Sequence, residues 1–153
     1  MSLIIAGGTN LGNKIENLHK ARVELGKIFT PISASKIYQS DAVDFPDQPP
    51  FYNQVLEFER PSISLDKMMS LLLELEMKFG RVRNIPKGPR IIDLDIIFVG
   101  LEKYNSSVVT IPHPRLFERS FIVTPLRELP YFSILDKHFN FTDRFDNTCV
   151  PIN

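Results

Sequence analysis

The run Ile91–Val99, which reads I-I-D-L-D-I-I-F-V, constrains the fold more than any other segment of the chain. It consists of large and β-branched apolar residues interrupted only by Asp93 and Asp95, so it predicts a buried β-strand. Because side chains alternate along a strand, the two carboxylates point to the same side. A sheet that contains this strand therefore brings two acidic groups to one face.

Two carboxylates on a mostly apolar strand are costly to bury unless they have partners. Mg²⁺ is one suitable partner, because it binds one or two carboxylates together with water and substrate phosphate oxygens. The alternative is that Asp93 and Asp95 form ion pairs with neighbouring arginines.

The segment just before this strand is cationic. It contains Arg81, Arg83, Lys87 and Arg90 with no acidic residue among them, although the whole chain carries 18 Lys+Arg and 18 Asp+Glu. These cations outnumber the two carboxylates, so ion pairing alone does not account for them. Guanidinium groups grip phosphate oxygens bidentately, and the G-P-R turn holds the segment rigidly next to the strand. The pattern predicts a nucleotide-polyphosphate site.

Length and composition limit the class of protein. At 153 residues with 43% hydrophobic content, the chain is expected to form one domain over residues 1–153. Near-zero net charge argues against a general nucleic-acid binder. The single Cys149 excludes an internal disulfide and fits a reducing compartment. No membrane span or signal peptide is recognisable, so we expect a cytoplasmic protein with no membrane partner.

Periodicity along the chain predicts an α+β fold. The expected elements are a strand at 3–6, a helix opened by a capping box at Asn13 and Glu16, strands at 33–40 and 52–59, a helix after Ser64 that ends at Gly80, the strand with the two aspartates, and a return strand at 108–111. This order is the split βαβ, or ferredoxin-like, βαββαβ pattern, with helices packed on a mostly antiparallel sheet.

Side-chain spacing assigns the faces of these elements. One face of the first helix is expected to carry Ile15, Leu18, Leu25 and Phe29, and the second helix carries an apolar stripe that includes Met68, Leu72 and Leu75. Phe51, Asn53 and Val55 fall on one side of their strand. The segment 41–50, with three prolines and three aspartates, is expected to be an irregular loop.

Two nucleotide motifs are absent. Gly7 and Gly12 have the spacing of a P-loop, but Asn13 stands where that motif requires lysine. The G-x-G-x-x-G pattern of dinucleotide folds is missing too. The phosphates must therefore be held elsewhere, and the cationic segment can hold them.

Two further polar residues have both a structural and a functional interpretation. Glu76 lies in the last turn of its helix, where the helix dipole disfavours negative charge, so it either pairs with Arg81 or Arg83 or is solvated. His113 stands between two prolines and close to Arg115 and Arg119, which suits a second anion contact. A lone histidine of this kind is also often structural.

Four segments together resemble one family. They are A-G-G-T-N-L-G at Ala6–Gly12, D-Q-P-P-F-Y-N at Asp47–Asn53, the central G-R-V-R…G-P-R-I-I-D-L-D-I-I-F-V-G, and P-H-P-R-L-F-E-R-S-F-I-V-T-P-L-R-E-L, covering about residues 3–128. The chain resembles 6-hydroxymethyl-7,8-dihydropterin pyrophosphokinases, the folate-pathway enzymes that transfer the β,γ-diphosphate of ATP to a pterin alcohol and release AMP.

The resemblance implies a role for each matching residue. Two Mg²⁺ ions would bridge the ATP phosphates at Asp93 and Asp95. The remaining ATP contacts would be made by Arg81 and Arg90 on the transferring diphosphate, by Arg83, His113 and Arg119 on the triphosphate, and by the adenine-facing backbone of Ile96 and Thr110. Lys87 is also expected to bind ATP. The pterin would lie between Phe51 and Phe121, with the Asn53 amide reading its polar edge and the backbone from Ser40 to Val43 completing the pocket.

In the implied mechanism the pterin hydroxymethyl oxygen attacks the β-phosphorus in line, and positioning and charge stabilisation supply most of the rate. Asp95 is the carboxylate nearest the attacking hydroxyl, so a proton-accepting role is a hypothesis. A homologue that binds without turnover and a diphosphokinase with another acceptor are the alternatives. The resemblance also leaves open fusion to, or association with, a neighbouring folate-pathway enzyme.

Three departures from the family pattern stand out. Lys87 replaces the usual tryptophan before G-P-R, and the segment 83–88 is one residue shorter. Ser40-Asp41 replaces a threonine-proline pair, and Thr9 replaces the serine of G-S-N. A loop that closes over the substrates would seal less completely, so we expect slower turnover of the same reaction.

Overall fold

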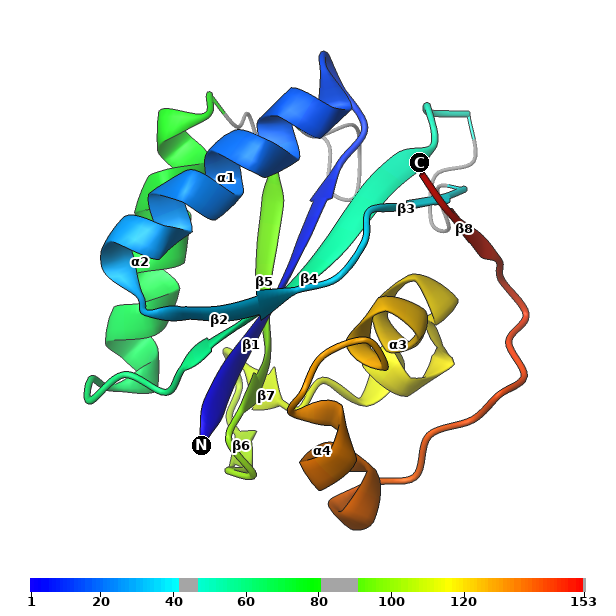
Figure 1. Ribbon diagram of the computed structural model, residues 1–153. Coiled ribbons are helices and arrows are strands. Elements are labelled where there is room, and N and C mark those ends of the chain that lie inside the picture. The colour runs from blue at the N-terminus through cyan, green and yellow to red at the C-terminus, as the bar shows by residue number, and fades with distance from the viewer. Residues whose placement is uncertain (42–46, 81–90, 153) are drawn as a thin grey trace.

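A computed structural model describes residues 1–41, 47–80 and 91–152 (Figure 1). The elements are β1 Ser2–Thr9, α1 Lys14–Ile28, β2 Pro31–Ala34, β3 Tyr38–Ser40, β4 Phe51–Glu59, α2 Leu65–Lys78, β5 Asp93–Val99, β6 Tyr104–Asn105, β7 Thr110–Ile111, the 3-10 helix η1 Pro114–Glu118, α3 Ser120–Leu126, α4 Phe132–His138 and β8 Cys149–Pro151.

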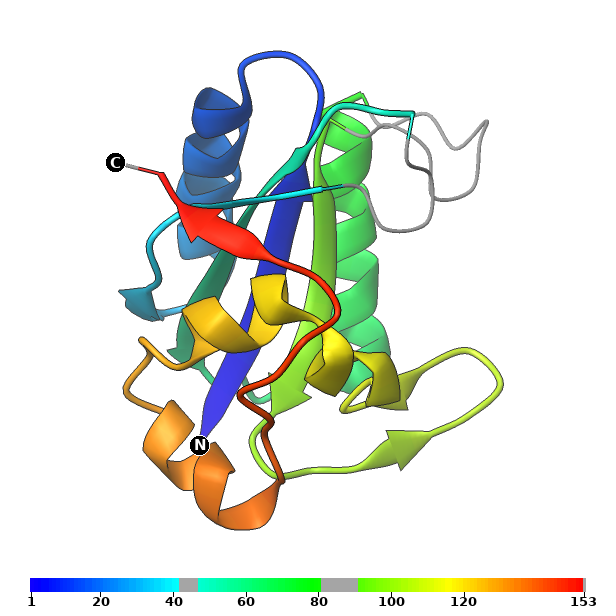
Figure 2. The same cartoon turned by 90° about the vertical axis from the view of Figure 1, so that its right-hand side faces the viewer.

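The main sheet has the strand order β5-β1-β4-β3-β8, and β2 also pairs with β4. The ladders between these strands are antiparallel. Helices α1 and α2 cover one face, and α3 and α4 lie on the other (Figures 1 and 2). The predicted α+β class, with helices packed on a mostly antiparallel sheet, is confirmed. The ferredoxin-like order of elements stays a prediction.

Each face of the sheet has its own apolar cluster. The cluster under α1 and α2 includes Leu3, Leu25 and Leu72, whereas the cluster under α3 and α4 includes Ile4 and Leu126. Neighbouring residues of β1 thus contribute to opposite clusters, as the alternation of a strand requires. Burial on both faces explains why β1 reads as a continuous apolar run.

The two long helices begin where the sequence predicts. The Asn13 side chain accepts a hydrogen bond from the Glu16 N–H at 3.1 Å, and the Ser64 hydroxyl accepts one from the Lys67 N–H at 3.2 Å. Gly80 follows α2 with a φ of +76°, the left-handed conformation that favours glycine. Of the residues expected on one face of α1, Leu18 and Leu25 are buried, whereas Ile15, in the first turn of the helix, is exposed.

The predicted strand at 33–40 is two strands, β2 and β3, which both pair with β4. Ser35 causes the break. Its hydroxyl accepts a hydrogen bond from the Val55 N–H at 3.0 Å and donates one to the Lys36 carbonyl at 2.7 Å. A side chain that bonds to backbone in this way competes with the regular ladder. The predicted return strand at 108–111 is shorter, because only Thr110 and Ile111 form β7.

Candidate functional site

The register of the sheet places four residues side by side, each on a different strand, and we call these four residues the site row. Asp93 of β5 is opposite Gly8 of β1, Gly8 is opposite Asn53 of β4, and Asn53 is opposite Tyr38 of β3. Directly opposed residues point to the same face of a sheet. Neighbouring strands lie about 4.8 Å apart, so this site row places a carboxylate and an amide about 10 Å apart across one face.

The site row lies on the face that α3 covers. Asp95 is opposite Ala6, and Ala6 belongs to the cluster that contains Ile122 and Leu126 of α3. Leu94, between the two aspartates, packs instead into the cluster under α1 and α2. The two carboxylates therefore share one face.

Gly8 leaves a gap in the site row. A Cβ atom at this position would come within 3.3 Å of the Asn53 Oδ1 atom and 3.7 Å of a Phe51 ring carbon. At Gly7, on the opposite face, the nearest atoms would be at ordinary contact distance. The absence of a side chain at Gly8 therefore keeps the space between Asp93 and Asn53 open.

The structure brings together three of the residues predicted to bind the pterin, namely Ser40, Phe51 and Asn53, and a fourth, Phe121, lies on the helix that packs on their strands. Asn53 is buried, and its Nδ2 atom donates a hydrogen bond to the Ser40 hydroxyl at 2.8 Å. Phe51 is opposite Ser40 in the β3–β4 ladder and is half-buried. Phe121 comes from α3, which packs on β3 and β4, and its ring is partly buried in the cluster beneath that helix.

Glu76 orders the start of the strand that carries the aspartates. Its side chain is only 3% exposed, and its Oε2 atom accepts a hydrogen bond from the Leu94 N–H at 2.7 Å. The interpretation of Glu76 as a solvated helix residue was wrong. A carboxylate that accepts a backbone N–H is strongly bonded, so Glu76 fixes the backbone between Asp93 and Asp95.

A cavity of about 690 Å³ opens between α2, the outer edge of β5 and the segment that contains β7. Four of the predicted site residues line it: Asp95, Ile96, Thr110 and His113. Glu76 also lines it, together with apolar side chains of α2. The cavity thus joins one of the two carboxylates to an apolar wall.

His113 is held as a neutral hydrogen-bond donor. Its Nδ1 atom accepts a hydrogen bond from the Arg115 N–H at 3.1 Å, which leaves the proton on Nε2. Burial, and then the positive charges of Arg119 and Arg115, lower the pKa of His113. The guanidinium carbon of Arg119 lies 5.9 Å from the centre of the Phe121 ring. Arg119 thus links the surroundings of His113 to α3.

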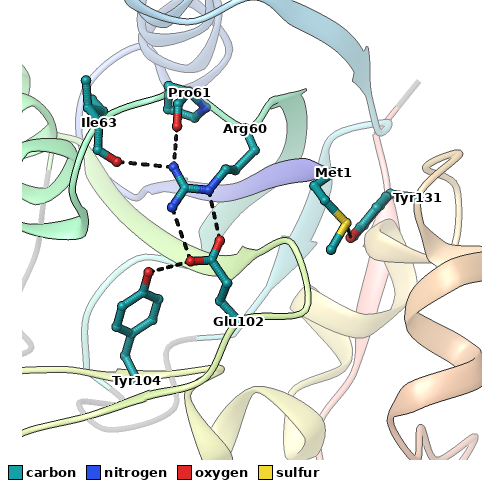
Figure 3. A network of polar contacts seen from close by, with 7 residues as sticks. All are labelled: Met1, Arg60, Pro61, Ile63, Glu102, Tyr104 and Tyr131. Atoms are coloured by element: carbon teal, nitrogen blue, oxygen red, sulfur yellow. Dashed lines mark hydrogen bonds and ion pairs between the residues drawn. The ribbon is translucent and has the colours of Figure 1, made fainter.

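The β6–β7 segment, which supplies part of the cavity wall, is anchored by an ion pair (Figure 3). Arg60, which follows β4, contacts Glu102 through Nε at 2.8 Å and Nη2 at 3.1 Å. The Tyr104 hydroxyl donates to the same carboxylate at 2.6 Å. Arg60 also donates to the carbonyls of Pro61 and Ile63. We call Arg60, Glu102 and Tyr104 the hairpin anchor.

Some predicted residues have no described placement. Val43, Arg81, Arg83, Lys87 and Arg90 lie outside the described residues. Within the described ranges no group of three or more His, Cys, Asp and Glu residues gathers as a metal cluster. Mg²⁺ requires only one or two carboxylates when phosphate and water complete its coordination, so the pair Asp93 and Asp95 fits this ion.

The prediction missed two residues that shape the site. Asn10 is buried, and its Nδ2 atom donates to Gln48 Oε1 at 2.7 Å and to the Pro49 carbonyl at 3.1 Å, so it ties residues 48–49 to the end of β1. The Tyr38 hydroxyl donates to the Glu128 carboxylate. Burial, and then this hydrogen bond, raise the pKa of Tyr38 to about 12. The G-G-T-N run was a signal for Asn10. The contact of Tyr38 with Glu128 spans 90 residues and left no local signal.

The comparisons with known proteins agree on one family. The family model described as 7,8-dihydro-6-hydroxymethylpterin-pyrophosphokinase (HPPK) matches residues 4–131. A Bacillus subtilis (strain 168) protein named 2-amino-4-hydroxy-6-hydroxymethyldihydropteridine pyrophosphokinase is 34% identical over 127 residues, which cover 82% of this chain and 75% of the relative.

Longer relatives match over the same region. The folic acid synthesis protein fol1 of Pneumocystis carinii is 40% identical over 129 residues, which are 84% of this chain but 17% of the relative. A mitochondrial folate synthesis bifunctional protein of Pisum sativum is 33% identical over 128 residues, which are 83% of this chain and 25% of the relative. The chain therefore spans a quarter or less of these two relatives.

Proposed function

Because the chain belongs to the 7,8-dihydro-6-hydroxymethylpterin-pyrophosphokinase family and is therefore an enzyme of folate synthesis, we propose that it transfers the β,γ-diphosphate of ATP to 6-hydroxymethyl-7,8-dihydropterin, giving the pterin diphosphate and AMP. The site row supports this location for the reaction, because it lies beside the cavity that Asp95 and His113 line.

The pterin occupies the face of β1, β4 and β3 at the Gly8 gap. The Asn53 amide is held by Ser40, so its remaining donor and acceptor positions can read the polar edge of a flat heterocycle. Phe51 and Phe121 supply the stacking rings, and the backbone from Ser40 to Val43 completes the pocket. The buried position of Asn53 favours a ligand whose edge both donates and accepts hydrogen bonds.

ATP occupies the cavity at the edge of β5. The backbones of Ile96 and Thr110 face the adenine, because an edge strand has backbone donors and acceptors without a neighbouring strand. His113 donates a hydrogen bond to the triphosphate from Nε2, and Arg119 contributes a charge-assisted contact. Arg81, Arg83, Lys87 and Arg90 supply the remaining positive charge.

Mg²⁺, as two ions with ATP, fits the carboxylates of Asp93 and Asp95 and, when bound, would neutralise phosphate charge. The protein itself contributes positioning. Asp95 lies on the sheet face next to the pterin pocket, so we propose that its carboxylate accepts the proton of the attacking hydroxyl. If this is right, Asp95→Asn lowers kcat at saturating Mg²⁺, whereas a normal rate would remove the proposal.

The location and partners follow the same reasoning. In the described residues no helix is long and apolar enough to cross a membrane. The single Cys149 and the net charge of zero support a cytoplasmic enzyme that acts on small molecules and not on nucleic acid. Relatives named bifunctional folate synthesis proteins support fusion to, or association with, a neighbouring folate-pathway enzyme.

The decisive experiment incubates the protein with ATP, Mg²⁺ and the hydroxymethyl-dihydropterin and follows AMP and the pterin diphosphate by chromatography. We expect equal amounts of both products, at a reduced rate because of Lys87. Tight ligand binding without AMP would indicate a binding protein. AMP that appears only with another alcohol would indicate a different acceptor.

A further inference from the structure

We propose that Asn147 is a positioning residue that holds the first turn of α3, and with it the Phe121 ring, over the pterin-binding face. This inference rests on the proposed function. Asn147 lies downstream of residues 4–131, which the family model matches, so the match assigns no role to it.

The hydrogen bonds described for the Asn147 side chain go to the end of η1 and the start of α3. Its Oδ1 atom accepts one from the Ser120 N–H and one from the Ser120 hydroxyl, both at 2.7 Å. Its Nδ2 atom donates one to the Glu118 carbonyl at 2.8 Å. Ser120 is buried and stands between Arg119 and Phe121, so these bonds fix the backbone that carries both side chains.

Helix α3 has no cap of its own. Arg119 occupies the N-cap position and makes no side-chain capping bond, yet the first N–H groups of a helix lack partners within the helix. Asn147 supplies this cap from 27 residues away in the sequence. A helix of seven residues that contains Pro125 is marginal alone, so its position depends on such contacts.

The segment that carries Asn147 also reaches the opposite wall of the pterin site. Two residues later it enters β8, in which Cys149 pairs with Ser40 and Pro151 with Tyr38. The Ile152 N–H then donates to the Ile37 carbonyl at 2.8 Å. Figure 2 shows this segment running past α3 to the strand beside β3. One stretch of chain thus connects the helix that carries Phe121 to the strand that carries Ser40.

The contacts of Asn147 bear mainly on the pterin. Of the residues proposed to contact ATP, they lie next to Arg119 alone, and the triphosphate has several other proposed partners. The cavity proposed for ATP is lined by residues of α2, β5 and the segment 106–114, none of which Asn147 contacts in the bonds described. Loss of the cap should therefore raise the KM for the pterin more than the KM for ATP. A purely structural residue would lower stability and affect both substrates alike.

The test compares Asn147→Ala, which removes all three bonds, with Asn147→Asp, which keeps an acceptor for Ser120. Thr148→Ala, at the exposed neighbouring position, is the matched control. For Asn147→Ala we expect the KM for the pterin to rise about fivefold or more, with the KM for ATP within about twofold. Asn147→Asp should recover part of the loss, and Thr148→Ala should behave as wild type.

A second measurement does not depend on catalysis. In Asn147→Ala the amide N–H of Ser120 should exchange with solvent faster, while the amides of β1 keep their wild-type rates. Unchanged exchange at Ser120, or an equal rise of both KM values, would overturn the inference. A wild-type chain that releases no AMP would instead refute the proposed function, and the exchange measurement would still decide whether Asn147 holds α3.

Discussion

At the scale of single residues, the site depends on Gly8, which has no side chain, as much as on the polar side chains around it. Gly8 separates the carboxylate of Asp93 from the amide of Asn53, and only its lack of a Cβ keeps that space open. The protonation of His113 is a second feature at this scale. Burial, and then the charges of Arg119 and Arg115, lower the pKa of its imidazole, and the Arg115 N–H occupies Nδ1, so Nε2 can donate a hydrogen bond to a polyphosphate.

Replacement of Gly8 by alanine should impair pterin binding without unfolding the protein. The new Cβ would lie 3.3 Å from Asn53 Oδ1, so the amide must shift by a few tenths of an ångström and the Cβ would occupy the gap. We expect the pterin Kd to rise about tenfold and the free energy of unfolding to fall by about 1 kcal/mol. Gly7→Ala is the matched control, because its Cβ makes ordinary contacts on the other face. Equal pterin affinity in the two variants would contradict the role of the gap.

The protonation of His113 can be followed by NMR titration of its ring protons. Burial and the charges of Arg119 and Arg115 lower its pKa, so the folded protein should titrate below the ordinary value of about 6.5. The stability linked to this group is present above the unfolded pKa and is lost as the pH falls through the folded one. Arg119→Ala should raise the pKa, and by more than Arg115→Ala does. If neither substitution changed the titration midpoint of His113, the proposed effect of these charges on its pKa would be wrong.

At the scale of elements, strong local patterns were predicted and long-range contacts were not. The Asn13 and Ser64 caps and the strand of the two aspartates are encoded within a few residues. The division of 33–40 into β2 and β3 depends on Ser35 bonding to Val55, 20 residues away. The site row could not be predicted, because it depends on which strands pair and in what register. Helices α3 and α4 have seven residues each, too few for a clear periodicity.

The hairpin anchor should control the nucleotide cavity through the β6–β7 segment. Arg60→Lys loses the two-pronged contact with Glu102, because an ammonium group cannot bind a carboxylate in this way. Since the pair is partly exposed to solvent, the free energy of unfolding should fall by only about 1 kcal/mol. The KM for ATP should rise while the KM for the pterin stays unchanged.

Lys27→Ala provides the comparison for this variant, because it breaks the more exposed pair with Glu24, and neither residue lines the cavity. It should leave both KM values at the wild-type level. Arg60 also lowers the pKa of Glu102 through its hydrogen bond, as does Tyr104. The stability that the anchor provides should therefore persist at neutral pH and disappear as the pH falls through the lowered pKa. If the difference in the free energy of unfolding between wild type and Arg60→Lys stayed the same as the pH fell, the role of the hairpin anchor would be contradicted.

At the scale of the whole molecule, one sheet serves two apolar clusters. Leu3 and Ile5 of β1 face α1 and α2, and Ile4 between them faces α3 and α4. The proposed pterin site is on the second face, whereas the proposed ATP cavity lies at the edge of β5, against α2. In this proposal the two substrates meet around the end of β5, where Asp93 and Asp95 lie. Their relative position depends on both layers of helices being fixed to the same strands.

We propose that residues 1–153 form one cooperative unit, because neither cluster can lose its packing while the shared strands stay intact. Leu72→Ala on one face and Leu126→Ala on the other each remove a buried side chain and should cost about 2–5 kcal/mol. In urea, the methyl NMR signals of Leu25 and Leu135, one from each cluster, should disappear at a common midpoint in wild type and in both variants. If Leu126→Ala lowered the midpoint of Leu135 and left that of Leu25 unchanged, the two faces would unfold independently, and the sheet would not couple the two substrate sites.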